Sequence, residues 1–168
     1  MHEPAFICSG GIVKYILSSA DKADLIASLA RLTACGGLFY RTFYEEFIAA
    51  DRRIKQLMSD TDSSRRQRIL AQSLTFTVLG ADGVTAPQEL RKLIDSHGPN
   101  GLNISADMMM KWRGALLRAV EKHDPEYNND VEHIWGTAAL HLIEHFQPSG
   151  AWRYALRTKV IKLKSEPN

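Results

Sequence analysis

His97 is the residue of this 168-residue chain whose type and setting offer metal chemistry most directly. A neutral imidazole is a strong metal ligand, and Gly98 and Pro99 stop the helix that is expected before it. Such an abrupt stop lets the ring project into a groove between helices. A histidine at a helix end is also stabilised at the surface by the helix dipole. The residues alone favour this second interpretation.

A further pair of histidines, His141 and His145, lies one helical turn apart with Glu144 between them. This HxxEH arrangement is used by a class of zinc peptidases, in which both imidazoles bind the metal. Those enzymes need another ligand from a separate downstream element, and only 23 residues follow His145. We therefore interpret the pair as two histidines on the partly solvated face of the last long helix.

The elements that must position these residues are helices, because apolar residues recur at helical spacing along most of the chain. We expect a short extra N-terminal helix and then helices over residues 21–33, 38–50, 51–57, 64–79 and about 87–96. Ser105 caps a long helix that ends at His123, and the last helix starts at Asp124-Pro125. The pattern predicts an all-α bundle of about seven helices.

The ends of the chain are assigned separately. The extra N-terminal helix is expected near residues 11–18, and Pro148 and Gly150 close the last helix. Residues 1–150 are therefore expected to form one domain, and residues 151–168 a basic C-terminal tail whose cationic side chains are solvated.

The composition is that of a soluble globular protein, with 45% hydrophobic and 24% charged residues. A net charge of +2 is too small to indicate nucleic-acid or membrane binding, and no basic recognition helix is evident. Cys8 and Cys35 have no metal-ligand spacing and are interpreted as reduced thiols, with one disulfide as the alternative. No export signal or anchor is indicated, so we expect a cytoplasmic protein with no membrane partner.

Several fragments extend the interpretation beyond a helical bundle. In chain order they are residues 43–58 from Phe43-Tyr44 to Met58, Thr61-Asp62 with Gln67 and Leu70, residues 93–104 around His97, Trp112, Leu116-Leu117, Asp124-Pro125 and Trp135. Each fragment is weak, but their order and spacing over about residues 22–147 are specific. Together they resemble the bacterial single-domain haemoglobins of the globin family.

The resemblance implies a globin-like fold that holds one b-type haem, with His97 as the proximal ligand of the iron. It places Tyr44 on the distal side, where a phenol donates to bound dioxygen; the alternative is a core tyrosine bonded to a nearby carbonyl. Gln67 is expected as a second polar distal group, with Arg68 as its competitor. The residues expected to contact haem are Phe43, Tyr44, Met58, Gln67, Leu70, Ala71, His97, Ile104 and Trp112.

The function that the resemblance implies is reversible binding of a diatomic gas, oxygen or nitric oxide, for oxygen binding, transport or sensing. The chain has no GxGxxG nucleotide fingerprint, so nitric oxide dioxygenation would require a separate reductase, and sensing a separate signalling partner. A homodimer through the last two long helices is left open. Met58 occupies a position where relatives nearly always carry phenylalanine. It motivates the alternative, a haem-free globin-fold signalling or interaction domain.

Overall fold

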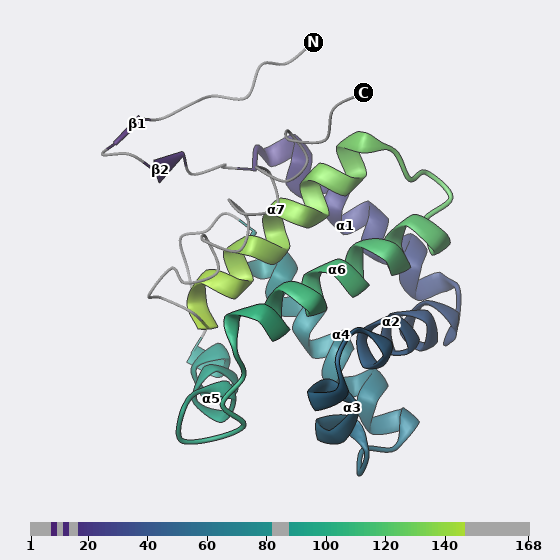
Figure 1. The fold of residues 1–168 in the computed structure, drawn as a ribbon. Helices are drawn as coiled ribbons and strands as arrows, with labels where there is room; N and C mark the ends of the chain where they lie inside the picture. Colours follow the sequence, from purple (N-terminus) through teal and green to yellow (C-terminus); the bar gives the residue numbers. More distant parts are fainter. Residues whose placement is uncertain (1–7, 10–11, 14–16, 82–87, 147–168) are drawn as a thin grey trace, which may run out of the picture.

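The computed structural model describes residues 8–9, 12–13, 17–81 and 88–146, and this part of the chain is built from seven helices and one short hairpin (Figure 1). The helices are α1 Ser19–Ala34, α2 Leu38–Ala50, α3 Arg52–Met58, α4 Ser63–Leu79, α5 Gln88–His97, α6 Ala106–His123 and α7 Asn129–Phe146. The prediction of an all-helical architecture is confirmed for these residues. The predicted tail at 151–168 lies outside the described residues.

The helix expected near residues 11–18 is wrong. Ile12–Val13 form a short strand, β2, that pairs antiparallel with β1, Cys8–Ser9. Isoleucine and valine are β-branched and favour extended backbone, and the intervening sequence Gly10-Gly11 is of the kind that closes two-residue hairpins. Ser18, at the end of the expected helix, instead caps α1.

Side-chain caps fix where several helices begin. The Ser18 hydroxyl accepts the Asp21 N–H at 3.1 Å, and the Asp21 carboxylate accepts the Ser18 N–H at 2.8 Å, so the two residues cap α1 reciprocally. Asp62 caps α4 by accepting the Arg65 N–H, and Ser105 caps α6 as predicted. Each cap contributes about 1 kcal/mol and sets which side chains of its helix face inward.

The last helix begins later than expected. It starts at Asn129, and the Asn128 side chain accepts the N–H groups of Asp130 and Val131 at 2.9 and 3.0 Å. Asp124-Pro125 belongs to the corner before it, where Asp124 ends α6. The predicted start was misplaced because Asp before Pro also reads as a helix cap followed by a first-turn proline.

The helices pack around one apolar core. α2 lies along α6, α7 lies beside α6, and α1 and α4 pack on α7 (Figure 1). The core joins all of these helices through Leu25, Phe39, Leu70, Leu116 and the fully buried Trp135. α5 stands apart, at the lower left of Figure 1, and is attached through a smaller cluster that includes Leu90 and Leu142.

A buried polar network ties α1 to the corner between α6 and α7. Asp124 accepts hydrogen bonds from the Ser28 hydroxyl at 2.5 Å and from Arg31 Nε at 2.6 Å, while Trp135 Nε1 donates to Ser28 Oγ at 2.8 Å. Burial raises the pKa of the Asp124 carboxyl, but the hydrogen bonds from Arg31 and Ser28 outweigh it and hold the pKa below its usual range. The network fixes α7 relative to α1.

None of the helices in the described part of the chain combines the length and the apolar character that crossing a membrane requires.

Candidate functional site

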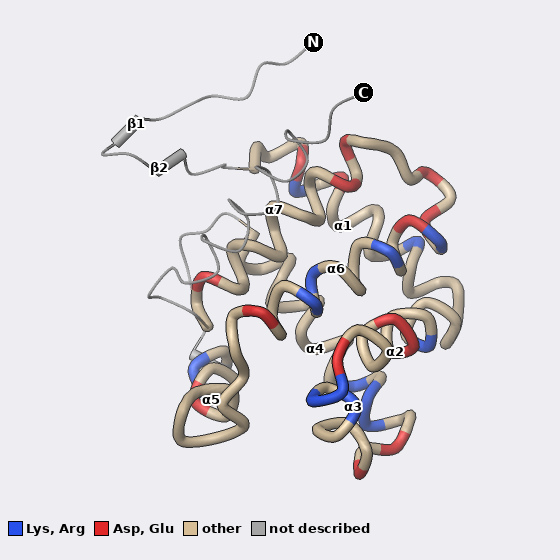
Figure 2. Tube along the Cα trace, viewed as in Figure 1, with Lys and Arg blue, Asp and Glu red and all other residues tan. Residues whose placement is uncertain are grey.

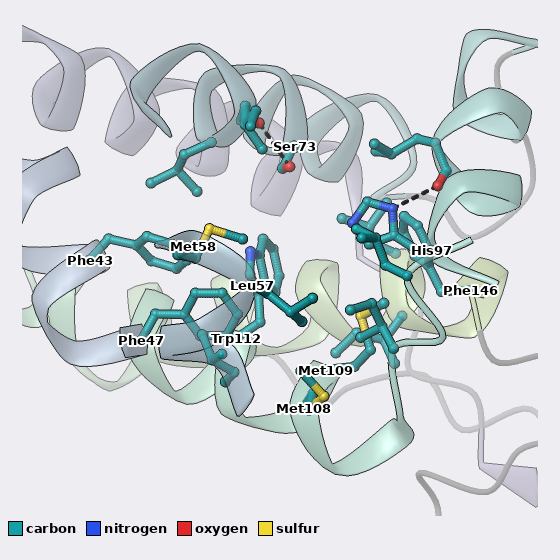
Figure 3. Close-up of a pocket in the computed structure, with 18 of the residues that line it drawn as sticks. Phe43, Phe47, Leu57, Met58, Ser73, His97, Met108, Met109, Trp112 and Phe146 are labelled. Carbon is teal, nitrogen blue, oxygen red and sulfur yellow. Dashed lines mark hydrogen bonds between the residues drawn. The ribbon is translucent and has the colours of Figure 1, made fainter. Parts of the chain in front are cut away.

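An apolar pocket lies between α2, α3, α4, α5, α6 and α7 (Figure 3). The cavity volume is about 90 Å³, smaller than the ~300–1,000 Å³ of typical ligand pockets, so a large ligand would have to move the walls apart. Its lining residues are Phe43, Tyr44, Phe47, Ile54, Leu57, Met58, Ile69, Leu70, Ser73, Leu93, His97, Leu102, Ile104, Met108, Met109, Trp112, Leu142, Ile143 and Phe146. Fifteen of these nineteen side chains carry no nitrogen or oxygen atom, so the lining suits an apolar ligand.

His97, at the C-terminal end of α5, reaches into this pocket from one side. Its Nδ1 lies 2.8 Å from the Leu93 carbonyl oxygen. A carbonyl only accepts, so the neutral ring carries its proton on Nδ1 and presents the lone pair of Nε2. Figure 3 shows that second nitrogen facing the pocket. Burial lowers the pKa of His97, despite the bond to Leu93, and so favours the neutral ring.

This arrangement is the one that metal-ligating histidines adopt, because a carbonyl that accepts from the far nitrogen orients the ring and fixes its tautomer. The ring of Phe146 also meets the His97 ring edge-on, with centroids 5.3 Å apart. The structure therefore places His97 in a pocket wall, rather than on open surface as the residues alone had favoured.

The loop after His97 folds back onto the last turn of α5. The Leu102 N–H donates to the Ser96 carbonyl and the Ile104 N–H to the His97 carbonyl, both at 2.9 Å. Gly101 lies so close to the Ser96 carbonyl that a Cβ atom there would overlap it. The glycine thus permits the close approach that brings Leu102 and Ile104 into the pocket wall.

Tyr44 lies at the edge of the pocket, but its hydroxyl is already engaged. The phenol donates to the Arg66 carbonyl of α4 at 2.6 Å, and burial raises its pKa. This is the alternative weighed from the sequence, a core tyrosine bonded to a nearby carbonyl. Tyr44 also lines a second hollow between α2, α3 and α4, which opens onto the surface.

The structure does not bring Gln67 or Ala71 to the pocket. Gln67 is exposed and lines the second hollow, and Ala71 packs against the main core. The cap at Asp62 and the contact between Tyr44 and the backbone of α4 set the phase of this helix. Gln67 comes one residue after Arg66, whose carbonyl bonds to Tyr44 of α2, and Ala71 comes one residue after Leu70, which lines the pocket. One residue along a helix turns a side chain by about 100°. Arg68 is exposed as well.

The other seven residues predicted from the resemblance line one pocket: Phe43, Tyr44, Met58, Leu70, His97, Ile104 and Trp112. Contact with haem stays a prediction for each. The sequence interpretation missed residues that share a face with predicted ones, such as Phe47, one turn after Phe43, and Leu93, one turn before His97. Helical spacing was a usable signal for both. Helical spacing gave no such signal for Leu142, Ile143 and Phe146 of α7, because these residues reach the pocket through tertiary packing.

A charged cluster holds α3, and with it Met58, against α6. Asp51 accepts hydrogen bonds from Arg53 at 2.7 Å and from Lys111 at 2.6 Å, and both cations also contact Asp107. These bonds, from Arg53 above all, lower the pKa of Asp51. Figure 2 shows cationic residues gathered along α3 with acidic residues beside them. The cluster fixes one wall of the pocket.

The helices adopt a globin-like fold, as the likeness to a solved structure shows. No family model matches the sequence, and the search of curated proteins found no match either. Among solved structures, the chain is similar to a Pseudomonas aeruginosa PAO1 protein described as structurally highly homologous to a human haemoglobin. The two are 25% identical with a TM-score of 0.66, and the alignment covers 75% of this chain and 98% of that one.

Proposed function

We propose that this chain is a haem-binding globin of the bacterial single-domain type, which holds one b-type haem through His97. The observation that carries the proposal is the setting of His97: Nδ1 bonds to the Leu93 carbonyl at 2.8 Å, and Nε2 faces an apolar pocket. A single neutral imidazole in an apolar slot is the donor set that haem iron takes in globins.

The pocket residues fit such a group. Aromatic and aliphatic side chains from six helices would cover an apolar macrocycle and exclude water, and the thioether of Met58 is polarisable enough to replace a phenyl ring at a porphyrin edge. Haem, when bound, would supply an iron that can accept a diatomic gas. The chain itself supplies the imidazole and holds it through Leu93 and Phe146.

The biological role that we propose is reversible binding of oxygen or nitric oxide, for oxygen binding and transport or for sensing, in the cytoplasm. Dioxygenation of nitric oxide by this chain would depend on a separate reductase, and sensing on a separate signalling partner. Pairing of two copies through α6 and α7 is part of the same proposal.

An absorption spectrum of the purified protein, as isolated and after addition of haemin, tests the haem site. We expect a Soret band in the wild type that shifts and weakens in His97→Ala. His133→Ala, a change at an exposed histidine of α7, is the matched control and keeps the wild-type band. Added imidazole should restore a ligated spectrum in His97→Gly, because it refills the position that the side chain leaves.

Two outcomes contradict the proposal. An unchanged Soret band in His97→Ala would mean that another group ligates the iron. A folded, colourless protein that takes up no haemin would favour the alternative, a haem-free signalling or interaction domain.

A further inference from the structure

The second hollow, between α2, α3 and α4, is much larger than the apolar pocket. Its volume is about 640 Å³, against about 90 Å³ for the pocket beside His97, and lies within the ~300–1,000 Å³ of typical ligand pockets. The buried rings of Tyr40 and Tyr44 and the half-buried Ile48 give it an apolar wall on α2. The hollow therefore has room for a small organic molecule with an apolar body.

The charged side chains of this hollow are mostly cationic. Arg41 of α2, Lys55 of α3 and Arg66 of α4 all line it. Glu45 is the acidic residue among its described lining, and it lies 3.9 Å from Arg41, so these two charges offset each other. Within the described ranges no carboxylate pairs with Lys55 or Arg66. These two residues therefore leave the hollow with a net positive charge.

The guanidinium of Arg66 is the more informative of the two cations, because it is half-buried. Its Nη2 donates to the Met58 carbonyl at 2.6 Å, which holds the group between α3 and α4. Its Nε is buried and has no hydrogen-bond partner among the described residues. A guanidinium carries five N–H donors and no acceptor, and a charge removed from water is costly unless an opposite charge pairs with it. A bound anion would neutralise this charge.

We propose that the second hollow binds a small organic phosphate. Its phosphate group lies between Lys55 and Arg66, and its body lies against Tyr40 and Ile48. A phosphate monoester carries about −1.5 to −2 charge at pH 7, which matches these two cations better than the single charge of a carboxylate. The planar guanidinium also suits the spacing of phosphate oxygens. The site lies outside the apolar pocket, and this inference does not depend on the proposed function.

Titration calorimetry of the purified full chain at low ionic strength tests the site, with phenyl phosphate as the probe. We expect one phenyl phosphate to bind per chain, more tightly than phenylacetate, benzyl alcohol or inorganic phosphate. Phenylacetate lacks the second charge, benzyl alcohol lacks any charge, and inorganic phosphate lacks the apolar body. Added salt should weaken the binding, because it screens the exposed charge of Lys55.

Substitutions of the two cations locate the binding. Lys55→Gln should weaken it about two- to fivefold, as expected for an exposed ion pair. Arg66→Gln should weaken it roughly tenfold or more, since a charged donor that is half-buried contributes more. Arg68→Gln is the matched control. It makes the same change of charge at an exposed cation of α4 that is not part of the hollow's lining, and it should leave the affinity nearly unchanged.

Several outcomes overturn the proposal. A wild type that binds no phenyl phosphate at millimolar concentration has no such site. Binding that Lys55→Gln leaves unchanged, or that Arg68→Gln weakens as much, is not binding in this hollow. Benzyl alcohol or inorganic phosphate that binds as tightly as phenyl phosphate removes the role of the charge or of the apolar wall, and phenylacetate that binds more tightly replaces phosphate as the ligand class.

The design also allows for loss of the Arg66 bond to Met58. If Arg66→Gln fails to fold for that reason, Lys55→Gln decides the question, because the Lys55 side chain is exposed. The titrations use the protein as isolated, with or without haem. A negative result here leaves the proposed haem site standing, and a colourless protein leaves this inference standing.

Discussion

Gly101→Ala should damage the turn that carries His97. A Cβ atom at position 101 would overlap the Ser96 carbonyl oxygen and lie 2.7 Å from the Ser96 carbonyl carbon and 3.1 Å from the Asp95 oxygen. These are backbone atoms of the last turn of α5, so no side chain can rotate away to make room. The loop must move outward, and the hydrogen bonds from Leu102 to Ser96 and from Ile104 to His97 must stretch.

The cost of such overpacking is about 1–3 kcal/mol, out of a typical total stability of ~5–15 kcal/mol. In a protein of this size each kcal/mol lowers the melting temperature by about 2–4 °C. The variant should therefore melt roughly 2–12 °C lower than the wild type. Because the displaced loop bonds to the His97 carbonyl through the Ile104 N–H, we also expect the variant to release haem faster if His97 holds haem as proposed.

Gly98→Ala, three residues earlier in the same loop, is the matched control. A Cβ atom there would lie 3.5 Å from the Asp95 and Ile94 carbonyl oxygens, an ordinary contact, so the change in stability should stay within about 0.5 kcal/mol. Thermal and urea unfolding, together with haem transfer to a scavenger protein, measure both effects. A Gly101→Ala variant as stable and as retentive of haem as Gly98→Ala would refute the reasoning.

Three further predictions test other parts of the structure. Ser28→Ala leaves the buried Trp135 N–H unpaired and removes one donor from Asp124, so it should cost about 2–4 kcal/mol in urea unfolding, whereas Thr33→Ala, at an exposed hydroxyl of the same helix, should cost little. The lowered pKa of Asp124 stabilises the fold fully above about pH 4 and progressively less below it. The stability gap between wild type and Asp124→Asn should therefore shrink as the pH falls from about 4 to about 3, and a constant gap would contradict the assignment. Gln67→Ala should leave gas dissociation unchanged, because Gln67 lies outside the pocket; a changed rate would restore it to the distal side.

Much of the architecture could be predicted because it is local. The bounds of α2 agree with the prediction residue for residue, and those of α4 within one residue, since caps, glycines and apolar spacing act over a few positions. The prediction missed the N-terminal hairpin because it depended on such local periodicity. A two-residue strand has no periodicity to detect, and only the Gly10-Gly11 pair indicated it.

The pocket was harder to predict, because it depends on the phase of each helix relative to its neighbours. A shift of one residue turns a side chain by about 100°, which is why Leu70 reaches the pocket and Ala71 does not. The hydroxyl of Tyr44 shows the same limit, since its acceptor, the Arg66 carbonyl, is a backbone atom with no signature in the sequence. The network around Asp124 joins residues 28, 31, 124 and 135, too distant along the chain for any local pattern.

Tyr44 lines both the apolar pocket and the surface hollow between α2, α3 and α4. Its side chain is therefore a wall between the two spaces, tied to α4 by its hydrogen bond to the Arg66 carbonyl. If the pocket holds a gas-binding haem as proposed, the strength of this one bond would help to set how readily the wall opens to solvent.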